Sequence, residues 1–252
     1  MTNDNKLIDD KETKTAIGLD EALGHTLARI SPLGTKNVGL FDASDRIAGE
    51  SLHAKVYSPS IDASLKDGYA VRSGDVAGAT AEHPVRLALS GHMAAGDLRD
   101  RKVAPGTTIR ILTGARIPKN ADAVLAEEFV ETEGDIVWAQ NTAGPGRNIL
   151  PKGSDVTPGK MIVSQGHKLT PGLVGLLAAA GHDRVQVFRN PHVAILGTGD
   201  EVVAPGRPLP EGKLYASNMA TLGAWCARYG MKSRMALVKD DLDEMFQTLK
   251  RL

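Results

Sequence analysis

The spacing of apolar residues predicts a helix near the beginning of the chain. Apolar side chains recur there at helical intervals, at Leu19, Leu23, Leu27 and Ile30. The acidic pair Asp20 and Glu21 stands in the first turn of this pattern, where negative charge favours a helix N-terminus. Pro32 cannot continue a helix, so we expect an amphipathic helix at about 19–30.

The pattern changes between residues 71 and 138 to short β-prone runs separated by Gly and Pro. These runs are "HPVRLAL", "TTIRIL", "ADAVLAEEFV" and "DIVWA". Short apolar or alternating runs between turn residues are typical of an all-β module. The Gly-rich stretch "NTAGPGRN" at 141–148 then marks a candidate boundary.

A short helix is predicted at "PGLVGLLAAA". Thr170 is suited to cap its N-terminus, Pro171 takes the first helical position, and Gly181 stands where a C-terminal glycine belongs. Because the segment is apolar on every side, we expect the helix to be largely buried.

The last sixty residues predict strand, helix, strand and helix in that order. "HVAIL" and "SRMALV" are the strands, and the first helix extends from about Ser217 to Tyr229, with Gly230 ending it. Asp240 is the predicted cap of the final helix. This alternation is the beginning of an open α/β sheet.

The final helix presents one apolar stripe, which consists of Leu242, Met245, Phe246, Leu249 and Leu252. Two strands cannot cover this stripe and both of their own faces. We therefore expect that another chain completes the sheet or that the sequence is part of a longer protein.

Composition narrows the function classes. The 252 residues contain 30 Lys plus Arg and 30 Asp plus Glu, so no net field attracts nucleic acid or an anionic membrane. No apolar run reaches the roughly 18 residues that span a bilayer, and the polar leader at 1–15 lacks the core of a secretion signal, so we expect a cytoplasmic protein.

The single cysteine, Cys226, excludes an intrachain disulfide. Its spacing to Leu222, Trp225 and Tyr229 predicts a buried thiol on an apolar helix face.

Two carboxylates stand close together in "DASLKDGYAV". An Asp-Gly pair before a β-prone run is typical of a turn in which Gly supplies a positive φ, which would explain Asp67 and Gly68. It does not explain Asp62 and Ser64, so the turn and a functional role both remain open.

The segment "GTGDEVV" at 197–203 places Asp200 and Glu201 after a buried strand. Ligands bind at the carboxyl ends of strands in open α/β sheets, and paired acids suit a hydrated Mg²⁺ held between carboxylates and substrate phosphates. A turn capped by Asp200 is the alternative. The seven histidines show no metal-ligand spacing.

Two further stretches allow a similar choice. In "RILTGARIP", Thr113 and Gly114 follow a β run, and the threonine is either a strand end or a hydroxyl donor to an oxyanion. In "RNILPKGSD", Lys152 precedes Asp155 by three residues, which by itself indicates a surface loop.

These stretches occur in an order that resembles the molybdopterin molybdotransferase (MoeA) family, which is related to the E domain of gephyrin. The resemblance covers about 19–252 and is carried by "SPSIDASLKDGYAV", "IRILTGARIPKNADAVLAEE", "GRNILPKGSDV", "AILGTGDEVVAPGRPL" and "LYASN". It implies insertion of molybdate into adenylylated molybdopterin with release of AMP, a step that requires Mg²⁺.

The resemblance also implies roles for individual residues. The catalytic set is Asp67, Thr113, Asp155 and Glu201. The residues expected to bind the molybdopterin are Gly114, Lys152, Thr198, Gly199, Ser217 and Asn218. The metal ligands are Asp200, Glu201 and Asp240. Asp62 and Ser64 would shape the loop that presents Asp67.

The implied architecture is an elongated α/β chain with an inserted all-β module, ending in a partial open α/β domain. Its parts are a leader at 1–15, a discontinuous linker domain at 16–60 and 150–187, a β domain at 61–149, and half of a molybdopterin-binding domain at 188–252. A homodimer and contacts with other proteins of molybdenum cofactor synthesis are expected, and nucleic acid and membranes are not.

Three departures leave a second function open. Leu150 and Pro151 replace arginines that are common in the family, and Ala216 replaces an aspartate. The sequence also stops before the family's S-G-G-V-S run, so the resemblance covers a C-terminally truncated member. The alternative is a non-catalytic molybdopterin-binding or scaffold homologue.

Overall fold

The computed structural model describes residues 17–252, and the predicted leader at 1–15 lies outside this range. The chain forms two compact units. One consists of residues 37–187, and the other of residues 188–252 together with the segment that ends at Lys36. Within the described range, no helix is both long and apolar enough to cross a membrane.

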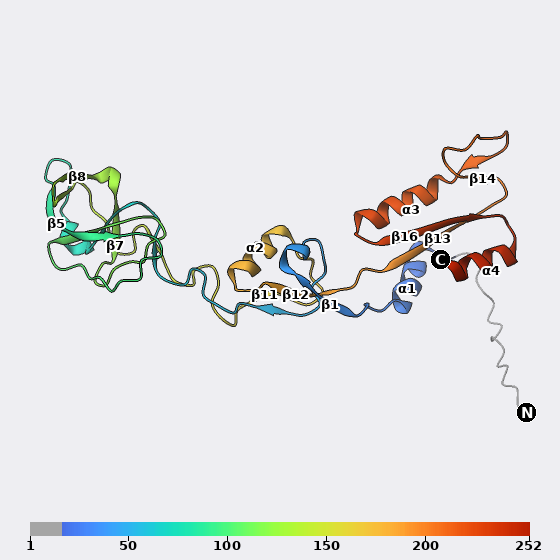
Figure 1. The fold of residues 1–252 in the computed structure, drawn as a ribbon, viewed down its shortest axis with the longest axis horizontal. Coiled ribbons are helices and arrows are strands. Elements are labelled where there is room, and N and C mark those ends of the chain that lie inside the picture. The colour runs from blue at the N-terminus through green and yellow to red at the C-terminus, as the bar shows by residue number, and fades with distance from the viewer. Residues whose placement is uncertain (1–16) are drawn as a thin grey trace, which may run out of the picture. The chain divides into compact units, whose positions relative to one another are not determined.

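The larger unit contains a six-stranded sheet with the order β7-β4-β6-β5-β9-β8. Figure 1 labels β5, β7 and β8 of this sheet. Its strands are β4 (Gly68–Val71), β5 (Val85–Met93), β6 (Thr107–Ile111), β7 (Ala123–Ala126), β8 (Val130–Glu133) and β9 (Ile136–Ala139). Neighbouring strands are antiparallel except for the parallel pair β5 and β6. The two edge strands β7 and β8 follow one another in the chain through the short 3-10 helix Glu127–Phe129, so the sheet is a curled half-barrel. The predicted all-β module is confirmed.

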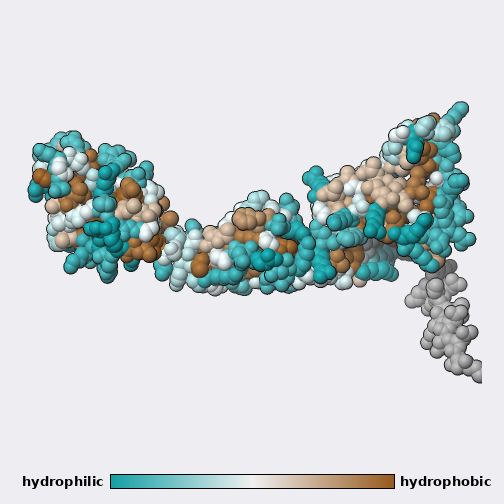
Figure 2. All heavy atoms as spheres, in the orientation of Figure 1, coloured by the Kyte–Doolittle hydropathy of each residue, from teal (hydrophilic) through white to brown (hydrophobic). Residues whose placement is uncertain are grey.

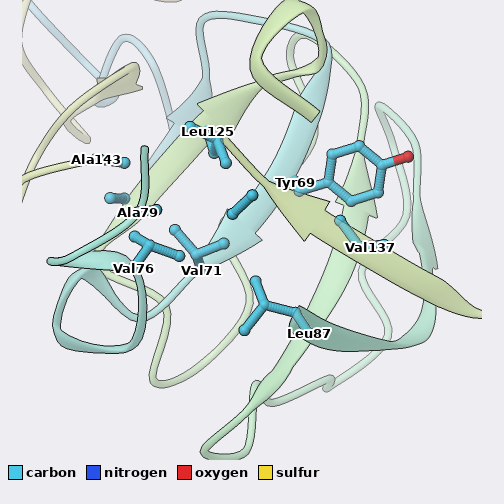
Figure 3. Close-up of a cluster of buried hydrophobic side chains, with 10 residues drawn as sticks. Tyr69, Val71, Val76, Ala79, Leu87, Leu125, Val137 and Ala143 are labelled. Atoms are coloured by element: carbon cyan, nitrogen blue, oxygen red, sulfur yellow. The ribbon is translucent and has the colours of Figure 1, made fainter. Parts of the chain in front are cut away.

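Both faces of this sheet are packed. One face carries the cluster shown in Figure 3, in which Tyr69, Val71, Leu87, Leu125 and Val137 meet from β4, β5, β7 and β9. The other face carries Ala70, Met93, Ile109, Ile111 and Val124. Since side chains alternate between faces along a strand, burial on both faces explains the unbroken apolar runs "GYAV" and "AVLA".

The larger unit also contains an α-helix, two further 3-10 helices at Leu40–Asp42 and Ser73–Val76, and three short strand pairs, the first of which extends into the smaller unit at 35–36 and Phe188. The pairs are β1 (Thr35–Gly39) with β12 (Arg184–Phe188), β2 (Leu52–His53) with β11 (Met161–Val163), and β3 (Ala63–Ser64) with β10 (Ile149–Leu150). Helix α2 (Pro171–Ala179) is capped as predicted, because the Thr170 hydroxyl accepts a hydrogen bond from the Leu173 amide at 3.3 Å. The expectation of a largely buried helix was wrong: of its nine residues only Leu177 is buried, because the helix packs on the core through one side.

The smaller unit contains the predicted strand and helix alternation. Its elements are α1 (Leu19–Arg29), β13 (His192–Thr198), β14 (Val202–Val203), β15 (Leu214–Tyr215), α3 (Ser217–Arg228), β16 (Lys232–Val238) and α4 (Leu242–Arg251). Strands β13 and β16 are parallel, and α3 connects them. The cap of α4 is Asp241 and not Asp240, since the Asp241 carboxylate accepts a hydrogen bond from the Glu244 amide at 2.7 Å.

Much apolar surface in the smaller unit is exposed, and Figure 2 shows brown spheres among the teal ones there. Leu242 of α4 is 82% exposed and Phe246 57% exposed, so the expectation that two strands leave this stripe uncovered is confirmed. Helix α1 forms where predicted, but it buries none of its residues. Cys226 is buried as predicted, whereas its neighbour Trp225 is 49% exposed, so the helix face they share is covered only in part.

The fold class is therefore confirmed as mixed α/β with a curled β module. The division into a linker domain, a β domain and half of an α/β domain stays a prediction.

Candidate functional site

The centre of the candidate site in the larger unit is a contact between Asp67 and Thr113. Asp67 immediately precedes β4, and Thr113 follows β6, the strand that pairs with β4. The amide and the hydroxyl of Thr113 both donate hydrogen bonds to Oδ1 of Asp67, each at 2.7 Å. In the described part of the chain, Oδ2 of Asp67 has no hydrogen-bond partner. One oxygen is thus fixed, and the other can meet a ligand.

The Asp67 carboxylate is held in its charged form. The Thr113 amide lowers the pKa of Asp67 most, the Thr113 hydroxyl lowers it further, and the positive charge of Arg110 makes a smaller contribution. The effect has a simple cause, because hydrogen bonds donated to a carboxylate stabilise the ion and not the acid.

Gly68 does not have the role that the turn hypothesis gave it. Its φ is not positive, and it opens strand β4. A Cβ atom at this position would overlap the backbone of Leu125 in the adjacent strand β7. Glycine is therefore required at this position by the close approach of β4 and β7. The predicted turn with a positive φ at Gly68 does not form, so it does not explain the presence of Asp67.

The loop before Asp67 is fixed by Asp62 and Ser64, as expected. Oδ1 of Asp62 accepts a hydrogen bond from the Lys152 amide at 2.7 Å, and the hydroxyl of buried Ser64 donates to the Lys66 carbonyl at 2.6 Å. The carbonyl of Ser64 accepts from the amide of Gly114, which adopts a φ of 79°. The loop therefore binds directly to the turn that carries Thr113.

Lys152 and Asp155 lie on a loop that packs on a neighbouring segment. The hydroxyl of Ser58 donates to Oδ2 of Asp155 at 3.3 Å, and Nζ of Lys152 lies 4.3 Å from the centre of the Tyr57 ring. Gly153 between them has a φ of 72°. Through the Lys152 amide, this loop is also attached to Asp62, so it is connected to the loop of Asp67.

The second group of predicted residues lies in the smaller unit, at the carboxyl edge of its parallel strands. Thr198, the last residue of β13, is in register with Val238, the last residue of β16. Asp200 and Glu201 follow the first strand and Asp240 the second, and all three are exposed. The edge predicted from the sequence is therefore present, with acids after both strands.

The remaining predicted residues border the same edge. Gly199 has a φ of 137°, and a Cβ there would lie 2.8 Å from Oε2 of Glu201. Ser217 and Asn218 form the first turn of α3, whose N-cap, Ala216, makes no side-chain hydrogen bond. The helix thus begins with amide groups that no capping side chain satisfies.

The described residues contain no group of three or more His, Cys, Asp or Glu side chains placed to hold a metal ion. The ligand role given to Asp200, Glu201 and Asp240 stays a prediction.

Sequence reasoning missed Arg110, whose positive charge acts on Asp67, and His92 on the next strand. They are opposite each other on the parallel strands β6 and β5, and both line one hollow. Strand register brings them together, and a bulge in β5 shifts that register between Leu89 and His92. The sequence carries no signal that locates this bulge apart from Gly91.

With this geometry in view, the chain can be compared with known proteins. The family model for the MoeA N-terminal region (domain I and II) matches residues 17–181. The chain belongs to the MoeA family. It is 34% identical over 244 residues to the molybdopterin molybdenumtransferase of Bacillus subtilis (strain 168), covering 95% of this chain and 57% of that protein. It is 36% identical over 187 residues to molybdopterin molybdenumtransferase 2 of Mycobacterium tuberculosis, covering 74% of this chain and 46% of that protein.

Solved structures of MoeA proteins are also similar. The molybdopterin biosynthesis MoeA protein of Pyrococcus horikoshii OT3 matches with a TM-score of 0.81 at 32% identity, over 92% of this chain and 62% of that one. A second crystal structure of a MoeA protein from the same organism gives a TM-score of 0.75 at 32% identity, over 93% of this chain and 60% of that one. The chain therefore spans little more than half the length of the Bacillus subtilis relative, and its MoeA-like region includes the Asp67 site.

Proposed function

We propose that this MoeA-family chain acts in molybdenum cofactor biosynthesis, in the insertion of molybdate into adenylylated molybdopterin with release of AMP. The observation that carries the proposal is the Asp67 carboxylate, which is fixed through Oδ1 by two hydrogen bonds from Thr113 and has no hydrogen-bond partner at Oδ2 among residues 17–252. Both residues lie within the segment that matches the family model.

In this proposal the residues of the larger unit position a ligand and stabilise charge. Asp67 stays ionised, so Oδ2 accepts a hydrogen bond from the ligand or from a water molecule that attacks it. Thr113 keeps the carboxylate in one orientation, which lowers the entropy lost when the reacting groups are brought into position. The ammonium of Lys152 supplies positive charge for an anionic part of the ligand. Asp155 lies on the same loop as Lys152 and accepts a hydrogen bond from Ser58 on the neighbouring segment.

Mg²⁺ fits the proposed chemistry only in part. Asp200, Glu201 and Asp240 offer the hard oxygen ligands that Mg²⁺ prefers, but the described residues form no ready group of three ligands. We therefore propose that Mg²⁺ binds together with the phosphates of the substrate, where it would offset their charge. Calorimetry should give little heat with Mg²⁺ alone, and tight binding without a phosphorylated ligand would overturn this assignment.

The function is tested with the purified chain, adenylylated molybdopterin, Mg²⁺ and molybdate. We expect cofactor formation, and a loss of at least about tenfold in Asp67→Asn, whose side chain lacks the charge. The matched control is Glu131→Gln, which removes one negative charge from an exposed position of β8 in the same sheet. Equal activities of the two variants would show that the Asp67 carboxylate has no role in the reaction.

A second candidate function is supported by the length of the match. The chain spans 57% of the Bacillus subtilis relative, and Ala216, Leu150 and Pro151 depart from the family pattern. A homologue that binds molybdopterin without inserting molybdenum is consistent with these observations. Binding of molybdopterin without any formation of cofactor would favour this alternative.

We also propose that the chain forms a homodimer, and that it contacts other proteins of the same pathway. The support is the exposed apolar surface of the smaller unit, where Leu242 and Phe246 of α4 face solvent. Light scattering at micromolar concentration should give at least twice the chain mass of 26.7 kDa. Phe246→Ser should reduce this mass, and a clean monomer for the original chain would contradict the proposal.

A further inference from the structure

One row of paired residues crosses four strands of the half-barrel, from the edge strand β7 to β5 in the middle of the sheet. Tyr69 is directly opposite Leu125 on β7 and Arg110 on β6, and Arg110 is directly opposite His92 on β5. Residues opposite each other on neighbouring strands present their side chains to the same face of a sheet. Leu125 and Tyr69 are buried in the core cluster, and in Figure 3 the Tyr69 hydroxyl points away from the other labelled side chains. Beyond Tyr69 the row continues with the two basic residues.

Arg110 borders two hollows on this face. The first, of about 470 Å³, is lined by Tyr69, Arg110, Glu127, Glu128, Val130 and Thr132. The second, of about 280 Å³, is lined by His92, Met93, Ala94, Arg110 and Leu112. Ligand sites are usually concave, and a few polar groups set into an apolar wall fix the orientation of the ligand. The second hollow has the chemistry of a more selective site, since basic and apolar groups alone line it.

The guanidinium of Arg110 has N–H groups that are available to a ligand. Its contact with Glu127, at 3.7 Å between Nη2 and Oε2, is an ion pair that is too long to be a hydrogen bond. Both side chains are more than half exposed, so the pair contributes little to stability. Within the described residues, Arg110 makes no side-chain hydrogen bond, which leaves five N–H donors for a ligand.

The side chain of His92 likewise has no hydrogen-bond or ion-pair partner in the part of the chain that the structure describes. An imidazole ring always presents at least one N–H donor, and register places it opposite Arg110. Ala94 and Leu112 supply the apolar part of the wall, next to buried Met93, whose side chain packs in the cluster on the other face of the sheet. Charge-assisted hydrogen bonds are stronger beside such a wall, because less water competes for the donors.

We propose that the hollow between Arg110 and His92 binds an oxyanion carried by a small organic molecule, of the phosphate monoester class. The planar guanidinium donates two parallel hydrogen bonds to two oxygens of the anion, and His92 donates to a third. The apolar wall contacts the organic part. Glu127 is the competing anion, and it must release Arg110 as the ligand binds.

This inference goes beyond the proposed function, because it assigns an organic oxyanion to the hollow of Arg110 and His92, which Asp67 does not line. Its test therefore contains no molybdate and no molybdopterin. Binding without molybdenum insertion, or insertion without binding, separates the two proposals.

The experiment is a titration of the chain with phenyl phosphate and with inorganic phosphate, followed by NMR of the Arg110 and His92 side chains and by calorimetry. We expect saturable shifts of both side chains, with phenyl phosphate at least about threefold tighter because only it contacts the apolar wall. Phenol at the same concentrations should leave the two side chains unshifted.

Four variants decide the outcome. Arg110→Gln should weaken phenyl phosphate about tenfold or more, and Arg110→Lys should also weaken it, since lysine keeps the charge but lacks the planar fork. His92→Asn should weaken it severalfold. Glu127→Gln should tighten binding about two- to threefold, because it removes the competing carboxylate. The control is Arg86→Gln, which removes an exposed arginine of β5 that lines neither hollow.

Each result supports or overturns the inference. Equal weakening by Arg110→Gln and Arg86→Gln would show that net charge alone attracts the anion, and the absence of saturation would show that there is no site. If Arg110→Gln lowers the melting temperature, the comparison of Glu127→Gln with the unchanged chain still decides, because tighter binding is expected only if Arg110 holds the anion.

Discussion

Thr113 donates both its amide and its hydroxyl to a single carboxylate oxygen of Asp67, at 2.7 Å each, although the two residues are 46 positions apart. Strands β4 and β6 bring them together, because Gly68 and Ile111 are paired across the sheet. The geometry of this contact is therefore set by the pairing of β4 with β6 in the half-barrel.

The first prediction concerns the pKa of Asp67 in variants of Thr113. Thr113→Val removes the hydroxyl but keeps the amide, so the pKa of Asp67 should rise part of the way to its ordinary value. Thr113→Ser keeps both donors and should leave the pKa nearly unchanged. The measurement is an NMR titration of the Asp67 carboxyl carbon. Identical titration curves for the valine and serine variants would rule out a contribution from the hydroxyl.

The second prediction concerns stability against pH. The folded-state pKa of Asp67 is lowered, so its stabilising contribution is present above about pH 4, the ordinary aspartate pKa, and is lost as the pH falls through the folded-state value. Asp67→Asn lacks this contribution. The difference in free energy of unfolding between the original chain and Asp67→Asn should therefore shrink below about pH 4. Urea unfolding of both proteins between pH 2 and 7 measures this difference. If the difference grew as the pH fell, the pKa of Asp67 would be raised by folding and not lowered.

The third prediction compares two glycines with similar backbone angles. Gly153 and Gly159 have φ values of 72° and 83°, so alanine costs about 1–2 kcal/mol at either position for the left-handed conformation. A Cβ on Gly153 also lies 2.8 Å from Cδ1 of Tyr57, whereas a Cβ on Gly159 meets open space. Gly153→Ala should thus lose about 1–3 kcal/mol more stability than Gly159→Ala in urea unfolding. Equal losses would mean that Tyr57 moves aside without cost.

The fourth prediction separates the two aspartates before α4. Asp241→Ala removes the hydrogen bond to the Glu244 amide and should cost about 1 kcal/mol. Asp240→Ala should change the free energy of unfolding by less than about 0.5 kcal/mol, as is usual for an exposed position. Denaturant unfolding followed by circular dichroism provides the comparison. A larger loss for Asp240→Ala would assign that residue a structural role.

Local patterns predicted the elements well. The β-prone runs became the six-stranded sheet, and the Thr170 and Pro171 signals placed the start of α2 correctly, because capping depends on neighbours within one helical turn. The wrong assignment of the α4 cap to Asp240 also concerns neighbours within one helical turn. The Asp-x-x-Glu spacing from Asp241 to Glu244 favours Asp241, since a cap bonds the amide three residues on.

Burial and side-chain partners were harder to predict. A helical stripe such as that of α1 shows which face is apolar, but not what covers it, and no residue of α1 is buried among the described residues. The roles of Asp62 and Ser64 came from a resemblance and not from spacing. Arg110 and His92 were missed because their proximity depends on the register of β5 and β6, and a bulge interrupts that register.

The short pair β3 and β10 places the entry and the exit of the half-barrel segment side by side, with Ser64 opposite Ile149. A segment whose two ends are already adjacent can be removed, exchanged or joined to a different host without stretching either chain. The backbone hydrogen bonds of this pair offset part of the loop-closure entropy of the segment between the two strands. The half-barrel should therefore be transferable as a cassette, and the Asp67 and Thr113 contact, which lies wholly inside it, should move with it.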